Sequence, residues 1–153
     1  MRLSFEDFNI GRVFTSEWRE VTEDEITRFA REYDPQPFHT GSSAHHVNFL
    51  FDTVVASGWH SASLCQRLIV DSFLVESTCL GCPGLDYLHW PSPLVPGDKI
   101  RAVSKVLHAR RSQSRPGVGI VKFEISLVAR EGKVVMEMLA NIFFDTGLPA
   151  FGH

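Results

Sequence analysis

The clearest pattern in the chain is an alternation of apolar and polar residues in its C-terminal half. A period of two is typical of a strand that buries one face. The stretch GIVKFEISLVA, residues 119–129, shows this period, with its apolar positions at Val121, Phe123, Ile125 and Leu127. Residues 130–133 predict a hairpin turn. The strand that follows would share one face among Val134, Met136, Met138, Ala140, Ile142 and Phe144.

Two further strands are expected before this hairpin, over residues 98–109 and 84–90. Gly, Pro and Ser punctuate residues 81–97, so this part of the chain predicts turns around the earlier strand.

The N-terminal half predicts helices. Residues 22–33 begin with Thr22-Glu-Asp-Glu25, a capping box with Thr22 as the N-cap. Ile26, Phe29 and Ala30 then share one apolar face, and Pro35 ends the helix. A short second helix is expected over residues 44–53.

The strongest helical segment is residues 58–75. Its apolar residues spread around most of the circumference, and they are Trp59, Ala62, Leu64, Cys65, Leu68, Ile69 and Leu74. A helix that is apolar on most sides is usually buried. The order of helix, buried helix and antiparallel strands predicts one α+β domain over residues 1–153, with the sheet wrapped around the long central helix.

Composition narrows the function classes. The chain has 153 residues, a net charge of −3 and scattered Lys and Arg, which argues against a nucleic-acid partner. It shows neither a signal peptide nor an uncharged apolar run of membrane-spanning length. An odd number of cysteines suits a reducing compartment, so we expect a cytoplasmic location. Cys79 and Cys82 form a lone C-x-x-C without a second ligand pair, so no metal site is expected.

The candidate chemistry lies in YDPQPFH, residues 33–39. Two prolines fix the chain between Asp34 and His39 and disfavour helix at the residues before them, so a stiff extended loop is expected. Asp34 and His39 are then either an acid–base pair in fixed geometry or an ordinary turn residue and loop histidine.

Three motifs together resemble the MaoC-like dehydratases, the (R)-specific enoyl-CoA hydratase group, which have the hot-dog fold. Asp34-Pro-Gln-Pro-Phe-His39 fits the group's D-x-[N/Q]-P-x-H pattern, Ala56-Ser-Gly-Trp-His60 looks like the start of its central helix, and Pro96-Gly-Asp98 precedes a strand. Two positions depart from the group: Ser57 stands where typical members carry His, and Thr40-Gly41 follows His39 where an Asp is often found two residues on.

The resemblance implies an acyl-CoA thioester as substrate, no separate cofactor, and a water held between Asp34 and His39. It also implies a homodimer that joins two sheets edge to edge, or a dimer of dimers. A histidine suits general acid–base work near neutral pH, and Asp34 can orient the water or carry the second proton transfer.

The start of the central helix is expected to complete the site. Ser57 is a good N-cap, and the Gly58 N–H can act as an oxyanion donor to which a ligand comes close. Trp59 and His60 are expected to line the substrate site.

Two other groups of basic residues are weaker candidates. Arg110 and Arg111 are expected either at a solvated hairpin end or against the phosphates of coenzyme A. His45 and His46 invite a metal with His39 and His60, but adjacent histidines seldom ligate one ion, so no metal is expected.

Two other functions remain open. A thioesterase of the same fold would use a carboxylate on the central helix, where the sequence after Gly58 has no acid until Asp71. The other alternative is a non-catalytic acyl-thioester binding module.

Overall fold

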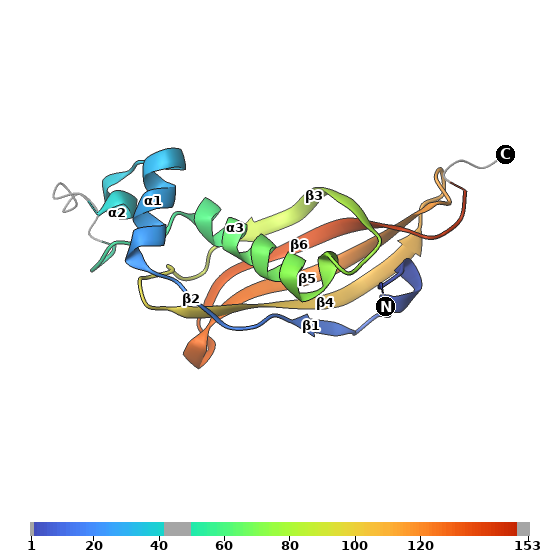
Figure 1. Ribbon diagram of the computed structural model, residues 1–153, viewed down its shortest axis with the longest axis horizontal. Helices are drawn as coiled ribbons and strands as arrows, with labels where there is room; N and C mark the ends of the chain where they lie inside the picture. Colours follow the sequence, from blue (N-terminus) through green and yellow to red (C-terminus); the bar gives the residue numbers. More distant parts are fainter. Residues whose placement is uncertain (1, 42–49, 150–153) are drawn as a thin grey trace.

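The computed structural model describes residues 2–41 and 50–149, which form an elongated molecule with a helical lobe at one end (Figure 1). In chain order, its elements are a 3-10 turn at Phe5–Asp7, β1 (Val13–Thr15), β2 (Arg19–Glu20), α1 (Glu23–Tyr33), α2 (Pro37–Thr40), α3 (Gly58–Ile69), a π-helical turn (Val70–Leu74), β3 (Cys79–His89), β4 (Lys99–Arg111), β5 (Val118–Ala129), a 3-10 turn (Arg130–Gly132) and β6 (Val134–Asp145).

The strands form one antiparallel sheet in the order β1-β4-β5-β6-β3, and β2 also pairs with β4. The sheet curves around α3, which lies along its inner face (Figure 1). The predicted α+β class and the wrapped central helix are therefore confirmed. The helix predicted over 58–75 is observed as α3 continued by the π-helical turn.

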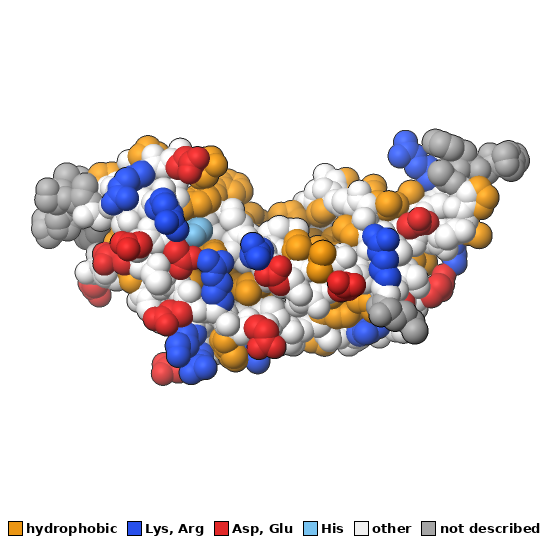
Figure 2. All heavy atoms as spheres, viewed as in Figure 1, with side chains coloured by type: hydrophobic (Ala, Val, Ile, Leu, Met, Phe, Trp, Pro, Cys, Tyr) orange, Lys and Arg blue, Asp and Glu red, His pale blue; other side chains and the backbone are white. Residues whose placement is uncertain are grey.

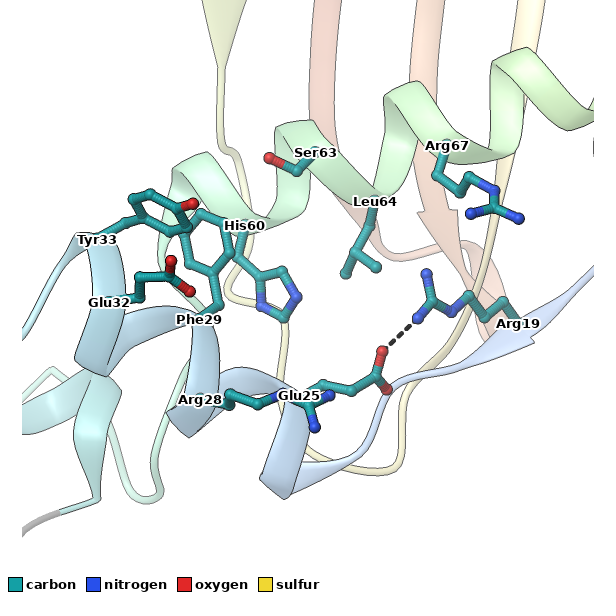
Figure 3. A pocket seen from close by; sticks show the side chains of 10 residues that line it. All are labelled: Arg19, Glu25, Arg28, Phe29, Glu32, Tyr33, His60, Ser63, Leu64 and Arg67. Carbon is teal, nitrogen blue, oxygen red and sulfur yellow. Dashed lines mark hydrogen bonds and ion pairs between the residues drawn. The ribbon is translucent and has the colours of Figure 1, made fainter. Parts of the chain in front are cut away.

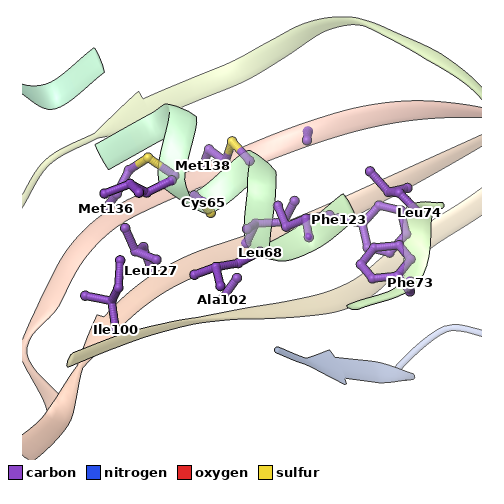
Figure 4. Close-up of a cluster of buried hydrophobic side chains, with 14 of the residues drawn as sticks. Cys65, Leu68, Phe73, Leu74, Ile100, Ala102, Phe123, Leu127, Met136 and Met138 are labelled. Carbon is purple, nitrogen blue, oxygen red and sulfur yellow. The ribbon is translucent and has the colours of Figure 1, made fainter. Parts of the chain in front are cut away.

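The core fills the space between α3 and the sheet (Figure 4). Leu64, Cys65 and Leu68 of α3 are buried there against strand residues such as Phe123 and Met136. Burial of one such side chain contributes about 1.5–3 kcal/mol, so this face of α3 holds the helix on the sheet. Burial also raises the pKa of the Cys65 thiol to about 12, which keeps the thiol protonated and unreactive.

The N-terminus of α1 has the predicted capping box. Thr22 Oγ1 accepts a hydrogen bond from the Glu25 N–H at 3.2 Å, and Glu25 Oε2 accepts one from the Thr22 N–H at 2.9 Å. Reciprocal bonds of this kind satisfy two donors at the helix start, which is why the sequence signature was reliable.

The hairpin between β5 and β6 is also as predicted. Glu131 and Gly132 both have positive φ, at 72° and 84°. The alternation along β5 is confirmed, because Val121, Phe123, Ile125 and Leu127 are fully buried.

The predicted inward face of β6 is right from Met136 to Phe144 and wrong at Val134. Val135 is buried there and Val134 is only partly buried. The register shifts between Leu127 and Val128, so an extra β6 residue faces β5 and reverses the alternation at this end.

β3 begins at Cys79, five residues before the start predicted at residue 84. Pro83 and Gly81 disfavour a central strand, but β3 is an edge strand paired with β6 on one side. Edge strands tolerate proline and bulges, and β3 shows three register shifts along its pairing.

The helix predicted over 44–53 falls mostly outside the described residues. Residues 50–53 are described and form a turn and bend instead of a helix. Within the part of the chain that the structure describes, no helix is both long and apolar enough to cross a membrane.

Candidate active site

The chain bends sharply where α1 meets α2. Asp34 caps the end of α1, and its N–H donates to the Ala30 carbonyl at 2.8 Å. The predicted extended backbone is present at Gln36, with φ −83° and ψ 142°, but 37–40 form a helical turn, so the loop prediction is wrong there. The reason is that Pro37 occupies the first helical position, where a missing N–H has no cost.

His39 is buried on this short helix with a defined orientation. Its Nδ1 lies 2.7 Å from the Val55 carbonyl oxygen. A carbonyl can only accept, so Nδ1 carries the proton and donates it. In the neutral ring, Nε2 is therefore the free base, and it lies 3.4 Å from Asp34 Oδ2.

Both oxygens of Asp34 accept hydrogen bonds. Ser57 Oγ donates to Oδ2 at 2.7 Å, and Gln36 Nε2 donates to Oδ1 at 2.7 Å. Burial by itself raises the Asp34 pKa, but these two bonds and the nearby His39 outweigh it, so the pKa is below its usual value. Asp34 is therefore a carboxylate at neutral pH.

The same serine begins the central helix. Ser57 is fully buried, and its Oγ also accepts from the Trp59 N–H at 3.3 Å, so the predicted N-cap is present. The Gly58 N–H has no acceptor among the described residues. It lies at the positive end of α3, where a developing anion is stabilised.

Position 58 also requires a glycine because the Trp90 indole packs directly against it. A Cβ at position 58 would lie 2.6 Å from Trp90 Cε2 and 2.9 Å from two more ring atoms. Trp90 also contacts Trp59 edge to face, with ring centroids 5.4 Å apart.

These groups line one cavity of about 380 Å³. Its polar side is formed by Asp34, His39 and Ser57, and Trp59 and Trp90 contribute to an apolar wall. The structure thus brings together five of the predicted site residues: Asp34, His39, Ser57, Gly58 and Trp59. Trp90 was missed, because it is distant in sequence and belongs to no motif.

Three predicted residues lie elsewhere. His60 lines a different cavity, between α1 and α3 (Figure 3). Arg110 and Arg111 end β4 at the hairpin, far from the helical lobe (Figure 1). Arg111 pairs with Glu6 and lies over the Phe5 ring, which matches the solvated hairpin end that the sequence allowed.

Neither the surface charge nor the possible metal ligands point to a further binding site among the described residues. On the face shown in Figure 2, acidic and basic side chains are mixed, so no single-sign field covers it. The described residues contain no group of three or more His, Cys, Asp or Glu placed to hold a metal ion. His45 and His46 lie outside the described residues, and all three cysteines are free thiols.

Comparisons with known proteins show the family and the fold of the chain. Residues 7–127 match the model of the MaoC like domain. A solved MaoC-like dehydratase from Rhodospirillum rubrum is 35% identical and superposes with a TM-score of 0.84, over 94% of this chain and 97% of that one. The chain therefore belongs to the MaoC-like family of hydratases and dehydratases and has the hot-dog fold.

Two more distant matches are a solved structure and a relative in sequence. The R-hydratase PhaJ1 from Pseudomonas aeruginosa is 17% identical, with a TM-score of 0.73 over 94% of this chain and 86% of that one. The uncharacterized protein YdeM of Bacillus subtilis (strain 168) is 23% identical over 76% of this chain and 82% of its own length.

Proposed function

We propose that the protein is an enoyl-CoA hydratase or 3-hydroxyacyl-CoA dehydratase. It would add water reversibly to a 2-enoyl-CoA and give a 3-hydroxyacyl-CoA. The observation that carries this proposal is the separation of 3.4 Å between His39 Nε2 and Asp34 Oδ2 at the polar side of the cavity. One water bound to both groups would be oriented and activated there.

The reaction needs two proton transfers at adjacent carbons. The oxygen of water bonds to C3 as one group of the pair removes its proton, and the π electrons of the double bond shift toward the thioester. That same proton is then delivered to C2, either by the group that took it or after transfer to the other group, so the pair returns to its starting state. Neutral His39 has its base at Nε2, and Asp34 is ionised, so both can accept or relay a proton. Water adds to C3 only if the double bond is polarised, because C3 must be electrophilic.

The start of α3 would supply that polarisation. Negative charge develops on the thioester oxygen when water adds to C3. The unpartnered Gly58 N–H at the first turn of α3 can donate to this oxygen. Removal of one such donor typically costs about 100- to 1,000-fold in rate.

The cavity lining favours hydration over thioester hydrolysis. α3 contributes Gly58, Trp59 and Ser61 to the lining, and none is a carboxylate. A thioesterase with its carboxylate on the central helix would therefore have no such group here.

The test is an assay of crotonyl-CoA hydration with two readouts. The loss of the conjugated-thioester absorbance measures hydration, and a thiol-reactive dye measures the release of free coenzyme A. We expect absorbance loss without thiol release, and an (R)-3-hydroxyacyl product. Asp34→Asn and His39→Ala should each reduce turnover by roughly 100- to 10,000-fold. Asp24→Asn and His108→Ala are matched controls, because both residues are exposed and outside the cavity.

Two outcomes would contradict the proposal. One is near-full hydratase activity in both site variants with native circular dichroism. The other is stoichiometric release of free coenzyme A without a hydroxyacyl product, which would identify a thioesterase instead.

We also propose assembly as a homodimer, or a dimer of dimers, through β3. Hot-dog dehydratases form dimers or complexes. In the described residues, β3 pairs only with β6, and it exposes Leu80 and Leu85. An open strand edge with apolar side chains is a liability unless another strand covers it.

A further inference from the structure

A second cavity of about 310 Å³ lies between α1 and α3, and its lining differs from that of the Asp34–His39 site (Figure 3). Residues of three kinds matter in its lining: the guanidinium groups of Arg19, Arg28 and Arg67, the aromatic rings of Phe29 and Tyr33, and the imidazole of His60.

His60 is the unexplained group in this cavity. Its side chain is only 6% exposed, and no described residue forms a hydrogen bond with it. Its Nδ1 is fully buried without a partner, while its ring stacks on Phe29 with centroids 4.6 Å apart. Burial lowers the His60 pKa against the opposing effect of Glu25, so the ring is neutral and able to donate and accept. Buried polar groups normally have partners, so a polar ligand is the natural complement.

The arginines define the charge of that ligand. Arg28 has no ion-pair partner among the described residues. Arg67 pairs with Asp71 at 2.7 Å, but both side chains are largely exposed and the bond is easily exchanged. Arg19 pairs with Glu25, so these two charges of the lining offset each other. Guanidinium groups bind phosphate oxygens well, because their planar fork of N–H donors matches the geometry of the phosphate.

The aromatic rings define the rest of the ligand. Tyr33 is 67% exposed, so its ring can stack on a flat base. Glu32 also lines the cavity and can accept a hydroxyl hydrogen from a ribose. A volume of about 310 Å³ suits a group of nucleoside size.

We propose that this cavity binds the adenine nucleotide end of the acyl-CoA substrate. The inference rests on the proposed function, because it assumes an acyl-CoA thioester at the other site. The two cavities are neighbours along both helices: Tyr33 precedes Asp34, and Trp59 precedes His60. The pantetheine arm would cross this junction, because it joins the nucleotide to the thioester.

The test compares crotonyl-CoA with crotonyl-pantetheine, which lacks the nucleotide. In the wild type, KM should be lower for the CoA thioester. Arg28→Gln removes a charged contact, which is expected to raise that KM about tenfold and to abolish the difference between the two thioesters. Arg31→Gln is the matched control, because Arg31 is exposed on α1 and outside the cavity. It should behave as the wild type does.

The outcomes separate this inference from the proposed function. Equal KM values for both thioesters in an active wild type, or the same kinetics in Arg28→Gln and Arg31→Gln, would overturn the nucleotide site and leave the hydratase standing. If the wild type hydrates neither thioester, the proposed function fails, and calorimetry with 3′,5′-ADP decides the cavity alone. Binding that is lost in Arg28→Gln and kept in Arg31→Gln would support the site, and no binding would overturn it.

Discussion

Replacement of Ser57 by alanine tests the connection between the central helix and the candidate catalytic carboxylate. The Ser57 hydroxyl both caps the helix and binds the carboxylate. Ser57 Oγ donates to Asp34 Oδ2 at 2.7 Å and accepts from the Trp59 N–H at 3.3 Å, and the side chain is fully buried. Alanine removes both bonds without adding bulk, so the loss reports on them directly.

The size of the effect follows from the two bonds. Loss of a serine N-cap costs about 1 kcal/mol. Loss of a hydrogen bond to a charged group costs about 1.5–3 kcal/mol. The two share one oxygen and do not add in full. We expect the free energy of unfolding of Ser57→Ala to fall by about 2–3 kcal/mol, and Tm to fall by roughly 4–12 °C.

The pH dependence of this loss has a definite sign. The Asp34 pKa in the folded protein is below its usual value, partly because Ser57 donates to it. Its contribution to stability is therefore present above the unfolded pKa and disappears as pH falls through the folded pKa. The gap between wild type and Ser57→Ala should narrow as the pH is lowered through that region. The part due to the helix cap should remain at every pH.

Urea denaturation between pH 7 and pH 3 measures both parts. Ser63→Ala is the matched control: Ser63 is exposed on the same helix, and its Oγ donates to the Trp59 carbonyl at 2.8 Å. Its change should stay within about 0.5 kcal/mol. If Ser57→Ala loses no more stability than Ser63→Ala, or if its loss is independent of pH, the hydrogen bond from Ser57 to Asp34 does not contribute to the free energy of unfolding.

Two more predictions concern the wall of the site and the open sheet edge. Gly58→Ala should destabilise by about 1–3 kcal/mol, because its Cβ would meet the Trp90 ring at 2.6 Å. Urea denaturation should show the cost falling in a Trp90→Ala background, and an unchanged cost would mean that the indole is not the cause. Light scattering at micromolar concentration should give about twice the 17.2 kDa chain mass, and Leu80→Lys should favour the monomer. A monomeric wild type would contradict the β3 interface.

Elements with strong local patterns could be predicted from the sequence. The capping box at Thr22 and the alternation along β5 depend on neighbours in the chain, and both are observed. The pairing of Asp34 with His39 was expected from the motif that resembles the MaoC-like dehydratases. The two prolines alone left an ordinary turn open, and the extended loop that they predicted is replaced by a helical turn at 37–40.

Features that depend on distant contacts could not be predicted in this way. The bulge that buries Val135 depends on the register of β6 against β5. β3 extends back to Cys79 because it lies at an edge, and a local sequence does not reveal its place in a sheet. Trp90 enters the site only because the chain before β4 returns to the start of α3, as its contact with Gly58 shows.

His60 shows that two residues adjacent in the sequence of a helix need not line the same site. The sequence places it one residue from Trp59, and shared lining of one site was expected. Successive residues on a helix point about 100° apart, so Trp59 and His60 face different cavities.

Position 57, where the sequence departs from the motif that it resembles, connects the carboxylate to the central helix. Ser57 lies in a fully buried position between the end of α1 and the start of α3. Serine fits, caps α3 and fixes Asp34, whose Oδ2 lies 3.4 Å from the free nitrogen of His39. One hydroxyl therefore holds both the carboxylate and the first turn of α3, which carries the Gly58 N–H, while the Val55 carbonyl orients the base. This couples the position of Asp34 in the proposed water site to that of the proposed oxyanion donor.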